Sequence, residues 1–316
     1  MTITHTIERP SWLPPEEFPF RLRSLHLASG DVSYIDEGEG PTLLFVHAGL
    51  WSFIWRDVII GLRKDFRTIA IDFPGFGLAA ASDTDPTILG LSTVLAEFVA
   101  ELDLNDVTLV AHDLGGPVAL GAASDDPGRY QALVLTNTFA WEPDKWSLRA
   151  MLRTMGSRPM TWLDAATNFL PRMSTNRFGV GRHLSRAGKK AFRGPYRDRS
   201  RRRRLHLLMR STLNSGEHFT RIEETTCSAL NDRPVLTIFG QHNDPWGFQD
   251  RHAETFPNHE GTVVPKGYHF PMTVDPALFV DGWPPLWPSQ AWPPQAPSGA
   301  VRPLAAKPAI ISHLLN

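Results

Sequence analysis

Short apolar runs alternate along the chain with longer segments whose apolar residues recur at helical spacing. Residues 87–103 carry the three- and four-residue apolar spacing of an amphipathic helix, and residues 116–123 are typical of a small-residue helix. Solidly apolar short runs are typical of strands buried on both faces of a sheet. The alternation predicts an α/β fold, with a mostly parallel central sheet and helices on both faces. The predicted buried strands are residues 42–46, 67–72, 106–112, 132–137, 234–240 and 260–265.

Changes in this rhythm divide the chain into parts. Polar and apolar positions alternate in residues 21–28 and 31–36, on either side of Ser29-Gly30, which predicts a hairpin that opens the sheet. The middle of the chain has helical and no strand patterning, so we expect an inserted helical cap. The last residues are dense in proline, which cannot continue a helix, and we expect them to be disordered. The predicted parts are an N-terminal arm (1–20), an α/β core in two pieces (21–137 and 231–282), the cap (138–230) and the tail (283–316).

Composition narrows the class of protein. The formal net charge is −1 over 316 residues, so nothing global favours nucleic acid or an anionic membrane as a partner. Cys227 is the only cysteine, which excludes an internal disulfide framework and suits a reducing compartment. No signal peptide or membrane-spanning run is evident, so we expect a cytoplasmic protein. The basic run 197–204 is interpreted as a solvated helix face. No metal-ligand spacing is present, and we expect no cofactor.

The stretch LVAHDLGGPV, residues 109–118, has the outline of a nucleophile elbow, in which a strand turns sharply into a helix. Asp113 stands at the bend. Ala111, Gly115 and Gly116 supply the small residues that a strained bend between a close strand and helix requires. The alternative is that Asp113 only caps the helix, since aspartate is common at helix N-termini.

Two further residues follow later strands. Asp244 comes just after the strand at 234–240, and His269 comes just after the strand at 260–265. The order nucleophile, acid, histidine is the order expected of a triad in an α/β-hydrolase fold. Backbone N–H groups of Gly49, after the strand at 42–46, and of Leu114 are candidates for an oxyanion hole.

With these residues the chain resembles the α/β-hydrolase superfamily, in particular its branch with an aspartate nucleophile: haloalkane dehalogenases and their epoxide hydrolase relatives. The resemblance covers about residues 20–282. It is weakest in the cap. The matching segments are LLFVHAG, WSFIWRDVI, IDFPGFG, LVAHDLGGPVAL, FGQHNDP and PKGYHFPM.

An aspartate at the elbow changes the chemistry that a serine would perform. An aspartate that attacks a saturated carbon forms an alkyl ester, which water can cleave at the aspartate's own carbonyl carbon. The resemblance implies that Asp113 displaces the leaving group, His269 activates water, and Asp244 orients His269. The family pattern G-x-x-D, counted from Gly240, places the acid on Asn243, so a one-residue insertion is needed to bring Asp244 to the histidine.

The leaving group is left open by the sequence. Dehalogenases of this branch usually hold the halide with a tryptophan directly after the nucleophile and an asparagine after the His-Gly pair. This chain has Leu114 at the first position and lacks the second. Trp51, Trp141 and Trp146 are therefore candidates for the substrate or halide pocket, although core packing is the commoner role of a tryptophan. The expected partners are water and a small hydrophobic substrate, either a halogenated alkane or an epoxide.

Three alternatives remain. Epoxide hydrolases normally use two cap tyrosines, whereas only Tyr196 lies in the predicted cap. A non-catalytic or weakly active member of the fold is the second alternative, because a fold alone does not determine function. The third is a nicotinamide oxidoreductase, since residues 75–80 fit the pattern G-x-G-x-x-A. Pro74 and the polar residues that follow predict a loop there rather than the required helix.

Overall fold

The computed structural model describes residues 4–281, and the predicted tail at 283–316 lies outside them. The described residues form one nine-stranded sheet with the strand order β1-β2-β3-β5-β4-β6-β7-β8-β9. The first three strands and the β3–β5 pair are antiparallel, and all later neighbours are parallel. The strands are β1 (Thr4–Thr6), β2 (Arg23–Leu25), β3 (Val32–Glu37), β4 (Thr42–His47), β5 (Arg67–Asp72), β6 (Val107–Asp113), β7 (Tyr130–Thr138), β8 (Val235–Gly240) and β9 (His259–Val264).

The α/β fold expected from the sequence is confirmed, including the opening hairpin, which is β2 and β3. Strand β1 was not predicted, because its three residues are exposed and polar. The helices are α1 (Arg56–Leu62), α2 (Ile88–Glu101), α3 (Gly115–Asp125), α4 (Trp146–Met155), α5 (Arg158–Thr167), α6 (Phe169–Ser174), α7 (Arg186–Phe192), α8 (Arg199–Thr212), α9 (Gly216–Thr226), α10 (Phe248–Thr255), α11 (Pro271–Val274) and α12 (Pro276–Asp281).

The central strands are buried on both faces, as their uninterrupted apolar runs require. Leu43, Leu44 and Phe45 of β4 have no exposed surface. Since β4, β6, β7, β8 and β9 run parallel, their carboxyl ends meet at one edge of the sheet. Side chains that follow these strands are therefore brought together at that edge.

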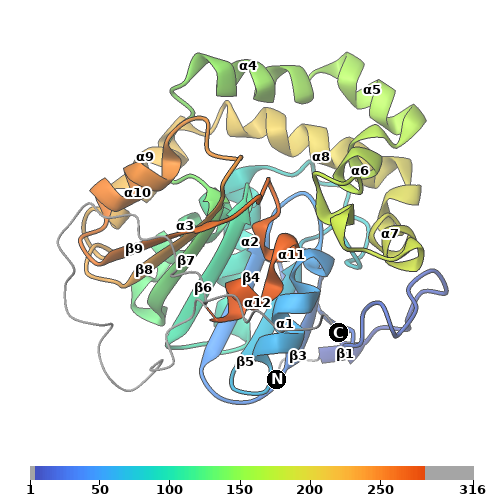
Figure 1. Ribbon diagram of the computed structural model, residues 1–316, viewed down its shortest axis with the longest axis horizontal. Coiled ribbons are helices and arrows are strands. Elements are labelled where there is room, and N and C mark those ends of the chain that lie inside the picture. Colours follow the sequence, from blue (N-terminus) through green and yellow to red (C-terminus); the bar gives the residue numbers. More distant parts are fainter. Residues whose placement is uncertain (1–3, 282–316) are drawn as a thin grey trace, which may run out of the picture.

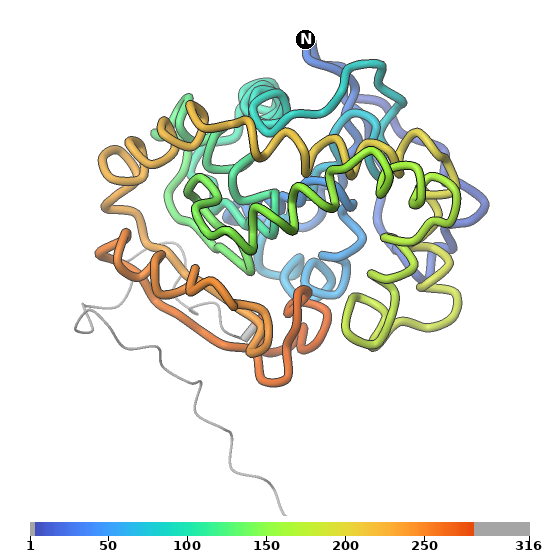
Figure 2. Tube along the Cα trace, turned by 90° about the horizontal axis from the view of Figure 1, so that it is seen from above, coloured from blue at the N-terminus to red at the C-terminus, as the bar shows by residue number. Residues whose placement is uncertain are grey.

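The chain between β7 and β8 is helical, in agreement with its patterning. Figure 1 shows α4, α5 and α8 lying above the sheet, and Figure 2 shows them from above, crossing the molecule side by side. Helix α8 packs against α4 and α5. Helix α9 differs, because it packs against α3 of the core. The layer that covers this edge of the sheet therefore consists of the helices from α4 to α8. None of the described helices is both long and apolar enough to span a bilayer.

The interpretation of the basic run 197–204 as a solvated face is wrong for three of its arginines. Arg201 donates to the carbonyls of Gly77 and Ala79. Arg204 is buried and donates to the carbonyls of Pro74, Ser82 and Thr84, all in the loop after β5. Arg202 is also buried and binds carbonyls within the helical layer. The run therefore ties α8 to the core, and the segment 75–80 that it holds is a loop that opens no helix.

Candidate active site

Asp113 ends β6 with a positive φ of 53°, and α3 begins two residues later. A side chain at Gly115 would place its Cβ 2.6 Å from the carbonyl oxygen of Val46, so only glycine fits there. The Thr138 hydroxyl donates to the Asp113 carbonyl over 2.6 Å. A strained backbone that its surroundings hold in place is the local structure of a nucleophile elbow. Asp113 therefore does not act as an N-cap here, since the N-cap position belongs to Leu114.

His269 lies in the loop after β9 and faces Asp113. Its Nε2 is 3.6 Å from Asp113 Oδ2. The amide of Asn137, at the end of β7, donates to the carbonyls of Tyr268 and His269 over 2.9 and 2.8 Å. The same amide accepts the N–H of Gly240 at 2.9 Å. Asn137 thus joins three strand ends and holds the backbone that carries the histidine.

The position expected for the triad acid is corrected by the structure. Asp244 accepts the N–H groups of Phe248 and Gln249 at 2.8 and 2.9 Å, and so caps the start of α10. The neighbour of His269 is instead Asn243, whose Nδ2 is 3.4 Å from Nδ1 of the histidine. The loop after β8 contains no insertion that would move Asp244 into this place: the N–H of Asn243 binds the carbonyl of Gly240 in a tight turn.

Opposing influences act on the pKa of Asp113. Burial raises it, but the charge and hydrogen bond of His269 and the N–H of Leu114 outweigh burial, so the pKa lies below its ordinary value. Two further histidines lie behind the pair. Burial, with the charge of His269, lowers the pKa of His47 to about 3 and that of His112 well below its usual range. Both rings are therefore neutral near pH 7, and Asp113 is an anion.

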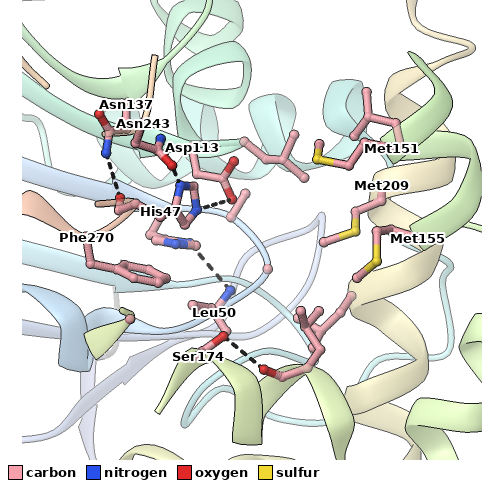
Figure 3. A pocket seen from close by; sticks show the side chains of 18 of the residues that line it. His47, Leu50, Asp113, Asn137, Met151, Met155, Ser174, Met209, Asn243 and Phe270 are labelled. Carbon is pink, nitrogen blue, oxygen red and sulfur yellow. Dashed lines mark hydrogen bonds and ion pairs between the residues drawn. The ribbon is translucent and has the colours of Figure 1, made fainter. Parts of the chain in front are cut away.

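A cavity of about 530 Å³ lies over this group, with Asp113 and His269 in its wall. Most of its lining surface is apolar, and part of the lining comes from the helices above the sheet. Figure 3 shows Asp113, His47 and Asn243 on one side and the sulfurs of Met151, Met155 and Met209 on the other. The lining side chains from the helical layer include Leu148, Met151, Leu152, Met155, Leu170, Met173, Leu205 and Met209.

A family model described as the alpha/beta hydrolase family matches residues 43–282, which is most of the chain and includes Asp113, Asn243 and His269. The chain belongs to this family. Haloalkane dehalogenase 2 of Mycobacterium bovis is 30% identical to the hydrolase over 261 residues, which cover 81% of this chain and 91% of the relative. A cis-3-alkyl-4-alkyloxetan-2-one decarboxylase of Xanthomonas campestris is 26% identical over 230 residues, covering 66% and 75%.

Solved structures confirm the fold of the hydrolase. A putative ancestral haloalkane dehalogenase superposes with a TM-score of 0.71 at 21% identity, covering 83% of this chain and 96% of that one. The epoxide hydrolase CorEH superposes with a TM-score of 0.70 at 20% identity, with the same coverage. At these identities the likeness concerns the fold. The relatives by sequence place the hydrolase with the haloalkane dehalogenase type.

None of the three tryptophans expected at the pocket lines the cavity of the hydrolase. Trp51 is fully buried and its indole N–H donates to the carbonyl of Phe192. Trp141 is buried between His252 and the guanidinium of Arg251. Trp146 is 81% exposed on α4. Aromatic residues at these positions serve packing or face solvent, so the pocket prediction for them is wrong.

Gly49 and Leu114, the candidates for an oxyanion hole, do line the cavity. Gly49 has a φ of 99°, and its carbonyl accepts the hydroxyl of the buried Tyr196 at 3.3 Å. Tyr196 thereby holds the loop after β4 and does not reach the cavity. The other tyrosines of the chain do not line the cavity either, so it has no tyrosine that could protonate an epoxide.

Sequence reasoning missed two parts of the site. Asn137 was not among the predicted site residues, because its role in holding the His269 loop depends on contacts between strands that only the fold brings together. Trp246 lines the cavity, and its indole N–H donates to the hydroxyl of Ser147. Its position after β8, close to Asn243 in the sequence, is the signal that could have found it.

Proposed function

We propose that the hydrolase displaces a leaving group from a saturated carbon by attack of Asp113, and that its substrates are small halogenated alkanes. The observation that supports this most directly is the ionised carboxylate of Asp113, held on an elbow and open to an apolar cavity beside His269. A carboxylate in such a place is a nucleophile for sp³ carbon, where a hydroxyl would give an ether that water cannot readily cleave.

The reaction balances in two steps. In the first, an oxygen of Asp113 bonds to the carbon, the carbon–halogen bond breaks, and halide leaves with the bonding electrons. In the second, His269 takes a proton from water while the water oxygen attacks the ester carbonyl of Asp113. The N–H groups of Leu114 and Gly49 would stabilise the resulting oxyanion. On collapse the bond between the carbonyl carbon and the alkyl oxygen breaks, and this oxygen takes the proton from His269 and leaves as the alcohol. The carboxyl group that remains on Asp113 loses its proton to water, which restores the carboxylate.

A leaving halide would be stabilised by an N–H donor, and His47 and Trp246 are two lining residues that carry a ring N–H. Nδ1 of His47 accepts the N–H of Leu50, so the neutral ring carries its proton on Nε2. This Nε2 has no hydrogen-bond partner among the described residues, but it is buried and does not meet the cavity. The indole of Trp246 already donates to Ser147. Neither of these two rings therefore offers a free donor to a halide in the cavity.

Opening of an oxetan-2-one is a second candidate function, favoured by the decarboxylase relatives and by a step that needs no base. Asp113 would attack the ring carbon that carries the ring oxygen, and the carbon–oxygen bond would break to leave an attached carboxylate. Loss of CO₂ would then form the alkene and expel Asp113 as its carboxylate. No proton moves in this sequence, so the amide at Asn243 would not impede it.

Bromide release from 1,2-dibromoethane and 1-bromohexane tests the first function, with Asp113→Ala as the paired control. We expect release by the unmodified protein and a fall of about 10⁴-fold or more in the variant, as for loss of a nucleophile in other enzymes. A folded protein that releases no bromide from either compound contradicts it. A cis-3,4-dialkyl oxetan-2-one is the parallel substrate, and Asp113-dependent alkene and CO₂ would support the second function.

A further inference from the structure

The place beside Nδ1 of His269 holds an amide where a hydrolytic triad needs an acid. Neither residue 244 nor residue 137 supplies it. Asp244 caps α10 through two backbone N–H groups. Asn137 is an amide, and its donors and acceptor are occupied by backbone groups. Among the described residues, the one carboxylate that pairs with His269 is the nucleophile Asp113 itself.

Asn243 also determines which nitrogen of His269 carries the proton. With Nδ2 of Asn243 donating to Nδ1, the neutral ring has its proton on Nε2, the nitrogen that faces Asp113. This tautomer cannot accept a proton from water at Nε2. Turning the amide over would present its oxygen to Nδ1 and reverse the tautomer. An amide oxygen nevertheless carries no negative charge to stabilise the imidazolium that forms when His269 acts as a base.

The surroundings do not replace the missing charge. His47 and His112 lie behind the site with their rings tilted, with ring centroids 5.0 Å apart and that of His112 4.8 Å from that of His269. Both are neutral, and neither can pair with a cation. The facing wall is built of leucine and methionine side chains. In such an apolar setting an unpaired imidazolium is costly to form.

The two chemical steps therefore depend on different groups. Attack by Asp113 needs only its ionised carboxylate, which the structure keeps ionised, and it needs no proton transfer. Cleavage of the ester needs water activated by His269, which the amide disfavours. Resting on the proposed function, we propose that the protein releases halide and then retains the alkyl group as a long-lived ester on Asp113, so that it captures substrate far faster than it turns over.

The experiment combines bromide release with intact-protein mass spectrometry after mixing with 1-bromohexane. We expect a burst of bromide equal to the amount of protein, then slow release, with a hexyl adduct that maps to Asp113. Asn243→Asp supplies the acid at unchanged size. It should accelerate ester decay by about 10²–10⁴-fold, because an amide in place of the acid costs about 10⁴-fold in a serine triad. The adduct should then no longer accumulate.

Asn176→Asp is the matched control, because it adds the same charge to a side chain that also lines the cavity. The Asn176 oxygen accepts the N–H groups of Phe178 and Gly179, and aspartate preserves that acceptor. We expect it to change ester decay far less than Asn243→Asp. Far-UV circular dichroism and urea unfolding check that both variants are folded before their ester decay is compared.

The possible results separate the two proposals. Adduct accumulation that Asn243→Asp removes supports the capture. Steady release of bromide over many turnovers with no adduct overturns the capture and leaves the proposed function standing. An adduct whose decay is the same in the Asn243→Asp variant overturns the role of Asn243. Neither bromide nor adduct, from a folded protein, overturns both.

Discussion

Among the histidines that contact an aspartate, His206 and His269 do so in opposite ways. His206 of α8 is fully buried, and its Nε2 is 2.9 Å from Asp164 of α5, which is also fully buried. Its Nδ1 lies 2.5 Å from the carbonyl of Met155, and the other Asp164 oxygen accepts the N–H of Leu170. His269 has 37% of its side chain exposed, and its contacts to Asp113 and Asn243 measure 3.6 and 3.4 Å.

The difference separates a structural pair from a reactive one. Both nitrogens of His206 face oxygen atoms at short range, so the pair joins α4, α5 and α6 to α8. Neither nitrogen is left to bind or transfer another proton. At His269 the contacts are long, one side is open to the cavity, and the partner is not a carboxylate. Packing that is complete gives stability, whereas packing that is incomplete leaves room for substrate and for a proton to move.

The largest expected effect is on stability, from Asp164→Ala. The change leaves Nε2 of His206 and the N–H of Leu170 without their partner, and each buried polar group left unpaired costs about 1–3 kcal/mol. Asn243→Ala removes the corresponding contact at His269 and should cost at most about 1 kcal/mol. Urea unfolding followed by circular dichroism measures both. Equal losses in the two variants would erase the distinction between the regions.

A smaller effect is expected from Asn137→Ala, which leaves the carbonyl of Tyr268 and the N–H of Gly240 without the amide, whereas the carbonyl of His269 keeps Nε2 of His112 as a partner. A buried polar group left unpaired costs about 1–3 kcal/mol. The loop that carries His269 should also lose its position, so in the Asn243→Asp background ester decay should slow by about tenfold or more. Asn231→Ala, which removes a single amide bond to Thr255, is the control. Unchanged ester decay in Asn137→Ala would count against its positioning role.

The smallest expected effect is a flat response to pH. The pKa of Asp113 lies below its ordinary value of 3.8, so its carboxylate stays ionised until the pH falls below that value. The rate of the bromide burst should therefore hold steady from about pH 8 to about pH 5, and fall only in more acid solution. A burst rate that halves between about pH 5 and about pH 6 would show that burial prevails over His269 and raises the pKa.

Local pattern was sufficient for the fold and for two members of the site. The apolar runs predicted the strands. The small residues around Asp113 predicted a sharp bend, because a strand and a helix that meet so closely leave no room for larger side chains. His269 followed from its place after a strand. The acid could not be located this way. Whether residue 243 or 244 reaches the histidine depends on a tight turn at Gly240 and on the N-cap of α10.

Positions in the helical layer were the least predictable from the sequence. Trp51 is buried and Trp146 is exposed, and nothing in the residue type distinguishes them. The sequence predicts that Arg201 and Arg204 face solvent, whereas the fold brings the loop after β5 against α8 and pairs both side chains with its carbonyls. Such contacts join residues more than a hundred positions apart, so no local spacing records them. The same holds for Asn137, whose partners lie at the end of β8 and in the loop after β9.

The exposed methionines of the cavity make its lining sensitive to oxidation. Met151 and Met173 both line the cavity, and they are 43% and 44% exposed. Oxidation converts a thioether into a polar sulfoxide, and exposed methionines are the accessible ones. Peroxide would therefore make part of the cavity lining polar and leave Asp113 and His269 unchanged. The affinity of the cavity for an apolar molecule would then depend on how far a sample has been oxidised, and a methionine sulfoxide reductase would restore it.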